Sequence, residues 1–247
     1  VTMGMALIGV LRRNRPMKDP EQEPRWANRY LLGVGVVIPA IILAIAFVAS
    51  LHVTELLSSG SRSAHLTISV TGHQWWWEAR YPNGAVTANE IHIPTGERVD
   101  VNLTTADVIH SFWVPQLQGK TDQIPGRVNQ TWLETDTPGR YRGECLQFCG
   151  LQHANMVFYI VAEPPSQFDA WEALQVQPAA APTTIQEAAG AGVFLTQSCA
   201  GCHTVRGTTA AGQVGPYRTH GAASQTIGAG VLANTPANLR QWILDVQ

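Results

Sequence analysis

The stretch CLQFCGLQHANM, residues 145–156, places four potential metal ligands in one short segment: Cys145, Cys149, His153 and Met156. Sulfur ligands select soft or borderline ions, chiefly copper, zinc or iron–sulfur clusters. A mononuclear electron-transfer copper site uses one cysteine, two histidines and a weak methionine, so it leaves the second thiolate without a role. Two copper ions bridged by both thiolates would use the whole set, provided that one more histidine comes from elsewhere in the chain.

Short strand-like segments surround this stretch between Leu66 and Ala162. They read LTISV, EIHI, RVDVNLTT, VNQTWLET and MVFYIVA, and the turn sequences PNG, PTG, IPG and TPG separate them. Several short strands at such spacing predict a small antiparallel sandwich or barrel. The candidate for the additional histidine is His110, because it ends a strand-like run and is followed by aromatic residues that could wall off a site.

These segments together resemble subunit II of cytochrome c oxidases. The resemblance is carried by the C-x-x-x-C-x-x-x-H-x-x-M spacing, by HSFWVPQL, GKTDQIPGRVNQ and GHQWWWEARYP, and by the preceding helical hairpin, and it spans residue 1 to about residue 165. It implies a cupredoxin-like domain that holds the dinuclear CuA copper centre. The ligands that it implies are the side chains of His110, Cys145, Cys149, His153 and Met156, with the backbone carbonyl of Gln147 as a weak ligand.

Gln147 departs from the pattern of that family, most of which has a glutamate here whose carboxylate also holds a magnesium ion at the contact with subunit I. We expect copper binding to survive, because the backbone oxygen is the copper ligand. A neutral amide is a poor substitute for an anionic ligand, so the resemblance does not carry the magnesium site over to this chain. Two alternatives to copper stay open: a zinc site, although methionine is a poor zinc ligand, and a Cys145–Cys149 disulfide.

The apolar run YLLGVGVVIPAIILAIAFVASL, residues 30–51, carries no charge over a length that can cross the hydrocarbon core of a membrane as a helix. Residues 1–11 are also uncharged and look like the end of a first spanning helix whose start is missing. A loop rich in arginine and lysine stays on the cytoplasmic side, so we expect everything after Leu51 to lie outside. A secretory signal peptide is the alternative, although its apolar core is normally shorter. The basic residues between the two apolar runs are Arg12, Arg13, Arg15, Lys18, Arg25 and Arg29.

In the tryptophan run of HLTISVTGHQWWWEARY, alternation along one uninterrupted strand predicts that Trp75 and Trp77 share the polar face. For Trp77 this favours packing against a partner subunit or lipid headgroups. For Trp75 the family resemblance implies a sharper role, as the point where electrons pass from a docked cytochrome c to the copper. A bulge at Gly72 would reverse the faces. We expect the other histidines, His52, His65, His73 and His92, at the surface or at interfaces.

The C-terminal part changes in composition, with a short helix and a Pro/Ala linker over residues 166–185. CAGCH, residues 199–203, is the attachment signature of a c-type haem, with Cys199 and Cys202 for the thioether links and His203 as axial ligand. Residues from about 186 onward resemble a class I, all-α cytochrome c domain, and the order of the domains resembles the fused subunit II of caa-type oxidases. No methionine follows Met156, so we expect the sixth haem ligand beyond Gln247, with His220 as the alternative.

The sequence therefore predicts four parts: a membrane hairpin (1–57), a CuA domain (58–165), a helix and linker (166–185) and a cytochrome c domain (186–247). The resemblance implies an oxidase subunit in a bacterial plasma membrane, with both metal domains on the periplasmic side. Electrons would pass from a cytochrome c or a quinol-oxidising complex through haem c and copper to subunit I, where dioxygen is reduced with proton pumping. The net charge of −2 gives no indication of nucleic acid. The alternatives are a CuA protein like nitrous oxide reductase and a copper-binding module.

Overall fold

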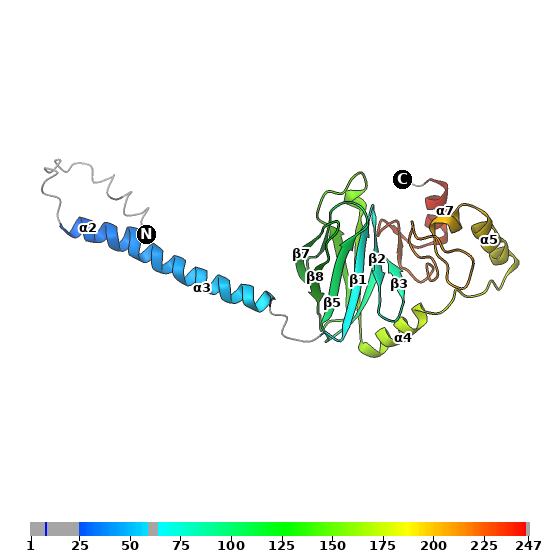
Figure 1. The fold of residues 1–247 in the computed structure, drawn as a ribbon, viewed down its shortest axis with the longest axis horizontal. Coiled ribbons are helices and arrows are strands. Elements are labelled where there is room, and N and C mark those ends of the chain that lie inside the picture. The colour runs from blue at the N-terminus through cyan, green and yellow to red at the C-terminus, as the bar shows by residue number, and fades with distance from the viewer. Residues whose placement is uncertain (1–7, 9–24, 59–63, 246–247) are drawn as a thin grey trace. The chain divides into compact units, whose positions relative to one another are not determined.

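The computed structural model describes residue 8 and residues 25–58 and 64–245, and Figure 1 shows its elements. The described residues form two compact units, one on each side of residues 59–63. The expected first helix, residues 1–11, lies outside the described residues apart from Ile8, and so does most of the basic loop.

The first unit is a long apolar helix built from α2 (Arg25–Leu32), the π-helical segment η2 (Gly33–Val37) and α3 (Ile38–Ser58). Residues Asn28–Glu55 are long and apolar enough to cross a membrane, and none of that apolar stretch is buried inside the protein. The π-helical turn, which is wider than an α-helical turn, lies just before Pro39. In a regular α-helix the ring of Pro39 would collide with the carbonyl of Gly35. The backbone N–H of Ile38 donates to Gly33 instead, so the helix continues through the proline.

The second unit begins with two five-stranded sheets that form the predicted sandwich. The first has the strand order β3-β2-β1-β5-β8, and the second has the order β4-β10-β9-β6-β7. Two neighbouring pairs, β1–β5 and β4–β10, are parallel, so the expectation of a purely antiparallel sandwich is wrong at these two places. The strands are β1 (Leu66–His73), β2 (Trp76–Arg80), β3 (Val86–Ala88), β4 (Glu90–Pro94), β5 (Val99–Thr105), β6 (His110–Val114), β7 (Gln118–Gln123), β8 (Asn129–Leu133), β9 (Gly139–Cys145) and β10 (Val157–Glu163).

The core lies between the two sheets and follows the alternation of the strands. Ile68 and Val70 of β1 and Val101 of β5 are fully buried from one side, and Phe158 and Ile160 of β10 from the other. Burying a large apolar side chain stabilises a fold by about 1.5–3 kcal/mol, so these alternating positions fix the register of each strand.

The tryptophan run is not one strand, and the expected exposure of Trp77 is wrong. β1 ends at His73, a turn holds Gln74 and Trp75, and β2 begins at Trp76. Across this hairpin Trp77 lies opposite Gly72, so it points to the same face as Val70, into the core. Its ring is fully buried against Phe112 and Phe158 of the other sheet, with centroids 5.8 and 4.9 Å away.

Two histidines are also less exposed than expected. The side chain of His92 is only 13% exposed; its ring stacks on Trp171 at a centroid distance of 4.0 Å, and its Nδ1 lies 3.3 Å from a carboxylate oxygen of Glu163. The half-buried His73 stacks on Trp76 at 4.2 Å. Aromatic neighbours within the same chain therefore cover both rings.

The C-terminal segment adds helices and a small hairpin beside the sandwich (Figure 1). Thr184 caps the helix at residue 185 through a capping box with Glu187, and the Thr235 hydroxyl accepts from the N–H of Asn238. The Pro/Ala linker packs more than expected, because the N–H of Ala179 donates to the carbonyl of Arg206. The elements are α4 (Pro165–Gln175), α5 (Ile185–Thr196), α6 (Cys199–Cys202), β11 (Thr226–Ile227), β12 (Leu232–Ala233) and α7 (Pro236–Leu244).

Candidate metal centre

The sulfur-rich stretch forms the connection between β9 and β10, two antiparallel neighbours in the second sheet. Cys145 is the last residue of β9, Cys149 lies in the connection, and Met156 directly precedes β10. The short 3₁₀ helix η3 (His153–Asn155) carries His153. β6 pairs with β9 on the other side, so His110, its first residue, reaches the same end of the sheet.

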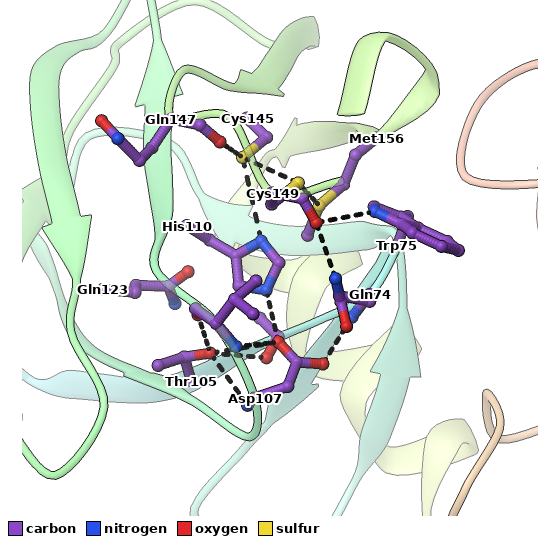
Figure 2. A network of polar contacts seen from close by, with 12 residues as sticks. Gln74, Trp75, Thr105, Asp107, His110, Gln123, Cys145, Gln147, Cys149 and Met156 are labelled. Carbon is purple, nitrogen blue, oxygen red and sulfur yellow. Dashed lines mark hydrogen bonds and ion pairs between the residues drawn. The ribbon is translucent and has the colours of Figure 1, made fainter. Parts of the chain in front are cut away.

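The structure brings the expected ligands together, as Figure 2 shows for those around the two sulfurs. The ligand atoms of His110, Cys145 and Cys149, all buried, lie within 4.8 Å of one another. The two Sγ atoms are 3.8 Å apart, so they are not joined as a disulfide. His110 Nδ1 lies 3.9 Å from Cys145 Sγ, and His153 Nδ1 lies 3.5 Å from Cys149 Sγ.

Two weaker donors complete the set. The thioether sulfur of Met156 lies 3.7 Å from Cys149 Sγ, and the backbone carbonyl oxygen of Gln147 lies 3.2 Å from Cys145 Sγ. The Gln147 side chain is exposed. Two thiols, two imidazoles and a thioether form a soft set that suits copper, whereas a single structural zinc ion prefers four ligands in a closed tetrahedron. The arrangement therefore fits two copper ions between the sulfurs.

Asp107 fixes the orientation of His110. One of its carboxylate oxygens lies 2.8 Å from His110 Nε2, and the other accepts from the backbone N–H of Gln74 at 2.7 Å (Figure 2). A carboxylate at Nε2 holds the proton there and leaves the Nδ1 lone pair facing the sulfurs. Gly72 gives the ring its space, because a Cβ at that position would lie 2.8 Å from His110 Cδ2.

The Gln74–Trp75 turn contacts the metal loop directly. Gln74 Nε2 and Trp75 Nε1 both donate to the carbonyl oxygen of Cys149, at 2.7 and 3.0 Å. These two bonds fix the backbone of the residue that supplies one of the two sulfur atoms. The hairpin turn that the sequence analysis did not foresee is therefore what brings Trp75 to the metal loop.

The charges at the site favour one thiolate over two. Burial works to raise the pKa of the Cys145 thiol, but its interactions with His110 and with the nearby backbone outweigh burial and lower the pKa to about 7. Burial and the neighbouring Cys145 raise the pKa of Cys149 to about 12. Two adjacent thiolates repel each other, so a bound cation is what allows both to ionise.

The second motif, CAGCH, lies on α6 and directly after it. His203 Nδ1 lies 2.8 Å from the carbonyl oxygen of Pro216, which leaves Nε2 available as a ligand. Gly215 permits this approach, because a Cβ there would lie 2.7 Å from His203 Cε1. Cys199 and Cys202 are free thiols, three residues apart on one side of α6.

A cavity of about 640 Å³ lies where the C-terminal segment meets the sandwich. Trp75, Trp76 and residues of the metal loop, among them Gln152 and Asn155, line it from the sandwich. His203, Arg218 and Trp242 line it from the C-terminal segment. The cavity therefore joins the histidine of the second motif to the tryptophan that contacts the first.

Comparisons with known proteins show the family to which the chain belongs. A family model described as cytochrome c oxidase subunit II, periplasmic domain, matches residues 84–163. Cytochrome c oxidase subunit 2 of Alkalihalophilus pseudofirmus is 38% identical over 243 residues, which cover 95% of this chain and 70% of that protein. The chain belongs to the cytochrome c oxidase subunit II family.

Further similar proteins share this name. Cytochrome c oxidase subunit 2 of Bacillus sp. (strain PS3) is 33% identical over 230 residues, covering 86% of this chain and 64% of that protein. The crystal structure of the periplasmic domain of subunit II of cytochrome oxidase of Bradyrhizobium japonicum is 33% identical, with a TM-score of 0.45, over 46% of this chain and 95% of that one. As a cytochrome c oxidase subunit II, the chain is a subunit of a haem–copper oxidase, and its role is electron transfer to subunit I.

Sequence reasoning missed Asp107 and Gln74. Asp107 bonds to His110, three residues later, and Gln74 bonds to Cys149, which is far away in the sequence. No spacing rule for metal ligands includes such partners. A carboxylate three residues before the candidate His110 is a weak signal that could have pointed to Asp107.

Proposed function

We propose that this chain relays electrons from a covalently bound haem c, through a dinuclear CuA centre, to subunit I of its oxidase. His110, Cys145, Cys149, His153, Met156 and the carbonyl of Gln147 hold the copper, and Cys199, Cys202 and His203 hold the haem. The observation that carries the proposal is the shared cavity, because Trp75 and His203 both line it and Trp75 also donates to Cys149.

The residues around the copper ligands keep the site rigid. Two copper ions held by these residues would supply a centre that exchanges one electron. Asp107 orients His110, and the turn at Gln74 and Trp75 fixes the backbone of Cys149. Ligands that are already in place need little rearrangement when the charge of the centre changes, and this favours fast transfer.

The residues of the second motif fit a c-type haem. A haem supplies an iron that takes up and releases one electron. Pro216 fixes the His203 ring with Nδ1 occupied, and His203 lines a cavity whose volume falls in the range of cofactor pockets. His220 lines the same cavity, but its Nε2 lies 3.1 Å from the carbonyl of Gln177, so we assign only His203 as an axial ligand.

The position of Trp75 supports its role as the place where electrons pass to the copper. Its ring reaches the cavity on one side, and its N–H donates to a residue of the metal loop on the other.

The apolar helix supports membrane anchoring, with both metal sites outside the membrane. As the electron donor to the haem, we propose a cytochrome c or a quinol-oxidising complex.

The full chain, expressed in a host that attaches haem c and supplied with copper, tests this proposal. We expect a mixed-valence copper signal in paramagnetic resonance together with the optical bands of a c-type haem that remains attached after denaturation. A chain that binds one zinc ion and shows no copper signal would contradict the copper assignment. A copper-loaded chain without attached haem would contradict the haem part alone.

Replacing Trp75 by phenylalanine tests the path between the sites. We expect slower electron transfer from haem to copper after flash reduction, with both spectra unchanged, because Trp75→Phe keeps an aromatic ring but removes the N–H that contacts Cys149. Trp76→Phe is the matched control, since Trp76 lines the same cavity but stacks on His73. Equal rates in the two variants would contradict the role of Trp75.

A further inference from the structure

Arg218 lines the cavity, and its guanidinium has no hydrogen-bond acceptor or ion-pair partner among the residues that the structure describes. Two other arginines lie where the C-terminal segment meets the sandwich, and unlike Arg218 both have partners. Arg140 pairs with Glu90 at 3.2 Å, and Arg206 donates to the carbonyls of Val176 and Gly84. The guanidinium of Arg218 is therefore left with five donors to satisfy.

The surroundings of Arg218 make this lack of a partner costly. Burial holds the pKa of Arg218 below its usual value, and no carboxylate offsets that effect. Arg218 is only partly exposed, and a charge that is partly withdrawn from water without a partner is unfavourable. An arginine at such a site is explained when a ligand that is not part of the polypeptide brings the negative charge.

The other residues that line the cavity also favour a negatively charged ligand. Among the described residues that line it, none is an aspartate or a glutamate, and the other ionisable side chains besides Tyr217 are His203 and His220. The wall is thus neutral to positive, and it is lined by aromatic rings such as Trp75 and Trp242. A flat, largely apolar ligand that carries carboxylates matches this combination.

The backbone holds Arg218 close to the second motif. The N–H of Arg218 donates to the carbonyl of Thr204, the residue after His203, at 2.9 Å. Pro216, two residues before Arg218, accepts from His203 Nδ1. One short loop thus positions both the axial histidine and the unpaired guanidinium.

We propose that Arg218 forms an ion pair with a propionate of the haem that His203 binds, and so orients the haem in the cavity and raises its reduction potential. This inference rests on the proposed haem site. Arg218 acts as a positioning residue with an electrostatic effect, because a nearby cation disfavours the oxidised, more positive iron. The pair also keeps the propionate ionised at neutral pH.

The test is a comparison of the haem midpoint potential as a function of pH in the full, copper-loaded chain. Arg218→Gln removes the charge, and we expect a lower potential than in the wild type. The propionate pKa should rise by about 1–3 units without its partner, so that the potential becomes pH-dependent in a range where the wild type is flat. Arg218→Lys keeps the charge and should stay close to the wild type.

Arg240→Gln is the matched control, because Arg240 is exposed on α7 and does not line the cavity. It should leave the potential and its pH dependence unchanged. A haem-loaded Arg218→Gln chain with the potential and pH profile of the wild type would overturn the proposal. If Arg218→Gln takes up no haem, recovery of haem by Arg218→Lys supports the ion pair, and failure of both variants overturns it. A wild-type chain without attached haem would overturn the proposed haem function as well, and a haem stain shows this before any potential is measured.

Discussion

Asp107 holds the metal centre together without being a ligand. Its carboxylate lies between His110 and the backbone of Gln74, so one side chain orients a ligand and ties down the turn that contacts Cys149. Burial alone would raise the pKa of Asp107, but the hydrogen bonds from His110, Gln74 and Val108 outweigh it and keep that pKa below its usual value. The carboxylate therefore stays ionised and available at neutral pH.

Asp107→Asn should weaken copper binding by about 10–100-fold, the usual effect of losing a hydrogen bond to a metal ligand. The amide cannot fix the proton on His110 Nε2 as a carboxylate does. Titration with a competing copper chelator measures the change, and Asp136→Asn, at an exposed position, is the control. Equal copper affinity in Asp107→Asn and the wild type would show that His110 is oriented without this carboxylate.

At the scale of the elements, β9 links the core to the metal centre. It pairs with β10 along its length and with β6 near its end, where Cys145 begins the metal loop. Gly143 of β9 lies against Phe158, and a Cβ at that position would lie 2.2 Å from the aromatic ring. The absence of a side chain at residue 143 lets the ring fill the core two residues before a metal ligand.

Gly143→Ala should lower the free energy of unfolding by about 1–3 kcal/mol, the usual cost of forcing an extra group into a packed core. Chemical unfolding of the chain in detergent, followed by tryptophan fluorescence, measures this loss. Gly139→Ala is the control in the same strand, because its Cβ would meet Tyr141 at an ordinary 3.8 Å. A loss of stability that is the same in both variants would contradict the packing argument.

At the scale of the whole second unit, an ion pair within the sandwich also binds the C-terminal segment through Gln225. Glu90 of β4 contacts Arg140 of β9 and accepts from the backbone N–H of Gln225, while Arg140 also donates to the Gln225 side chain. The carbonyl of Ala229 accepts from the N–H of Val157, which directly follows Met156. The C-terminal segment is thereby held against the sandwich by direct contacts, and not only tethered to it by a linker.

Glu90 should make the stability of this unit depend on pH. Burial raises the pKa of Glu90 above its ordinary 4.5, although Gln225 and Arg140 act against it. Because the folded state binds the proton more tightly, the contribution of Glu90 is full below about pH 4.5 and is lost as the pH rises through the raised pKa. The unfolding free energy of the wild type relative to Glu90→Gln should therefore fall over that range.

Urea unfolding of the chain in detergent at several pH values measures this difference. Glu97→Gln, an exchange at an exposed turn, should show no such trend relative to the wild type. A difference between the wild type and Glu90→Gln that stays constant with pH would contradict the raised pKa.

The sequence by itself determined the features that depend on spacing along the chain. These are the apolar helix, five of the strands, the capped helices that begin at Ile185 and Pro236, and the ligand pattern of residues 145–156. Each arises from contacts between near neighbours, such as the capping box at Thr184, or from a regular spacing of apolar residues that can be read from the sequence.

Only the tertiary structure decided the features that depend on which distant segments meet. The hairpin turn at Gln74 reversed the expected face of Trp77, since alternation cannot be continued through a turn. Asp107, Arg140 and Arg218 gained their roles, or their lack of a partner, from segments far away in the sequence. The cavity exists because the C-terminal segment packs on the sandwich, and such packing depends on complementary surfaces that no local pattern of residues encodes.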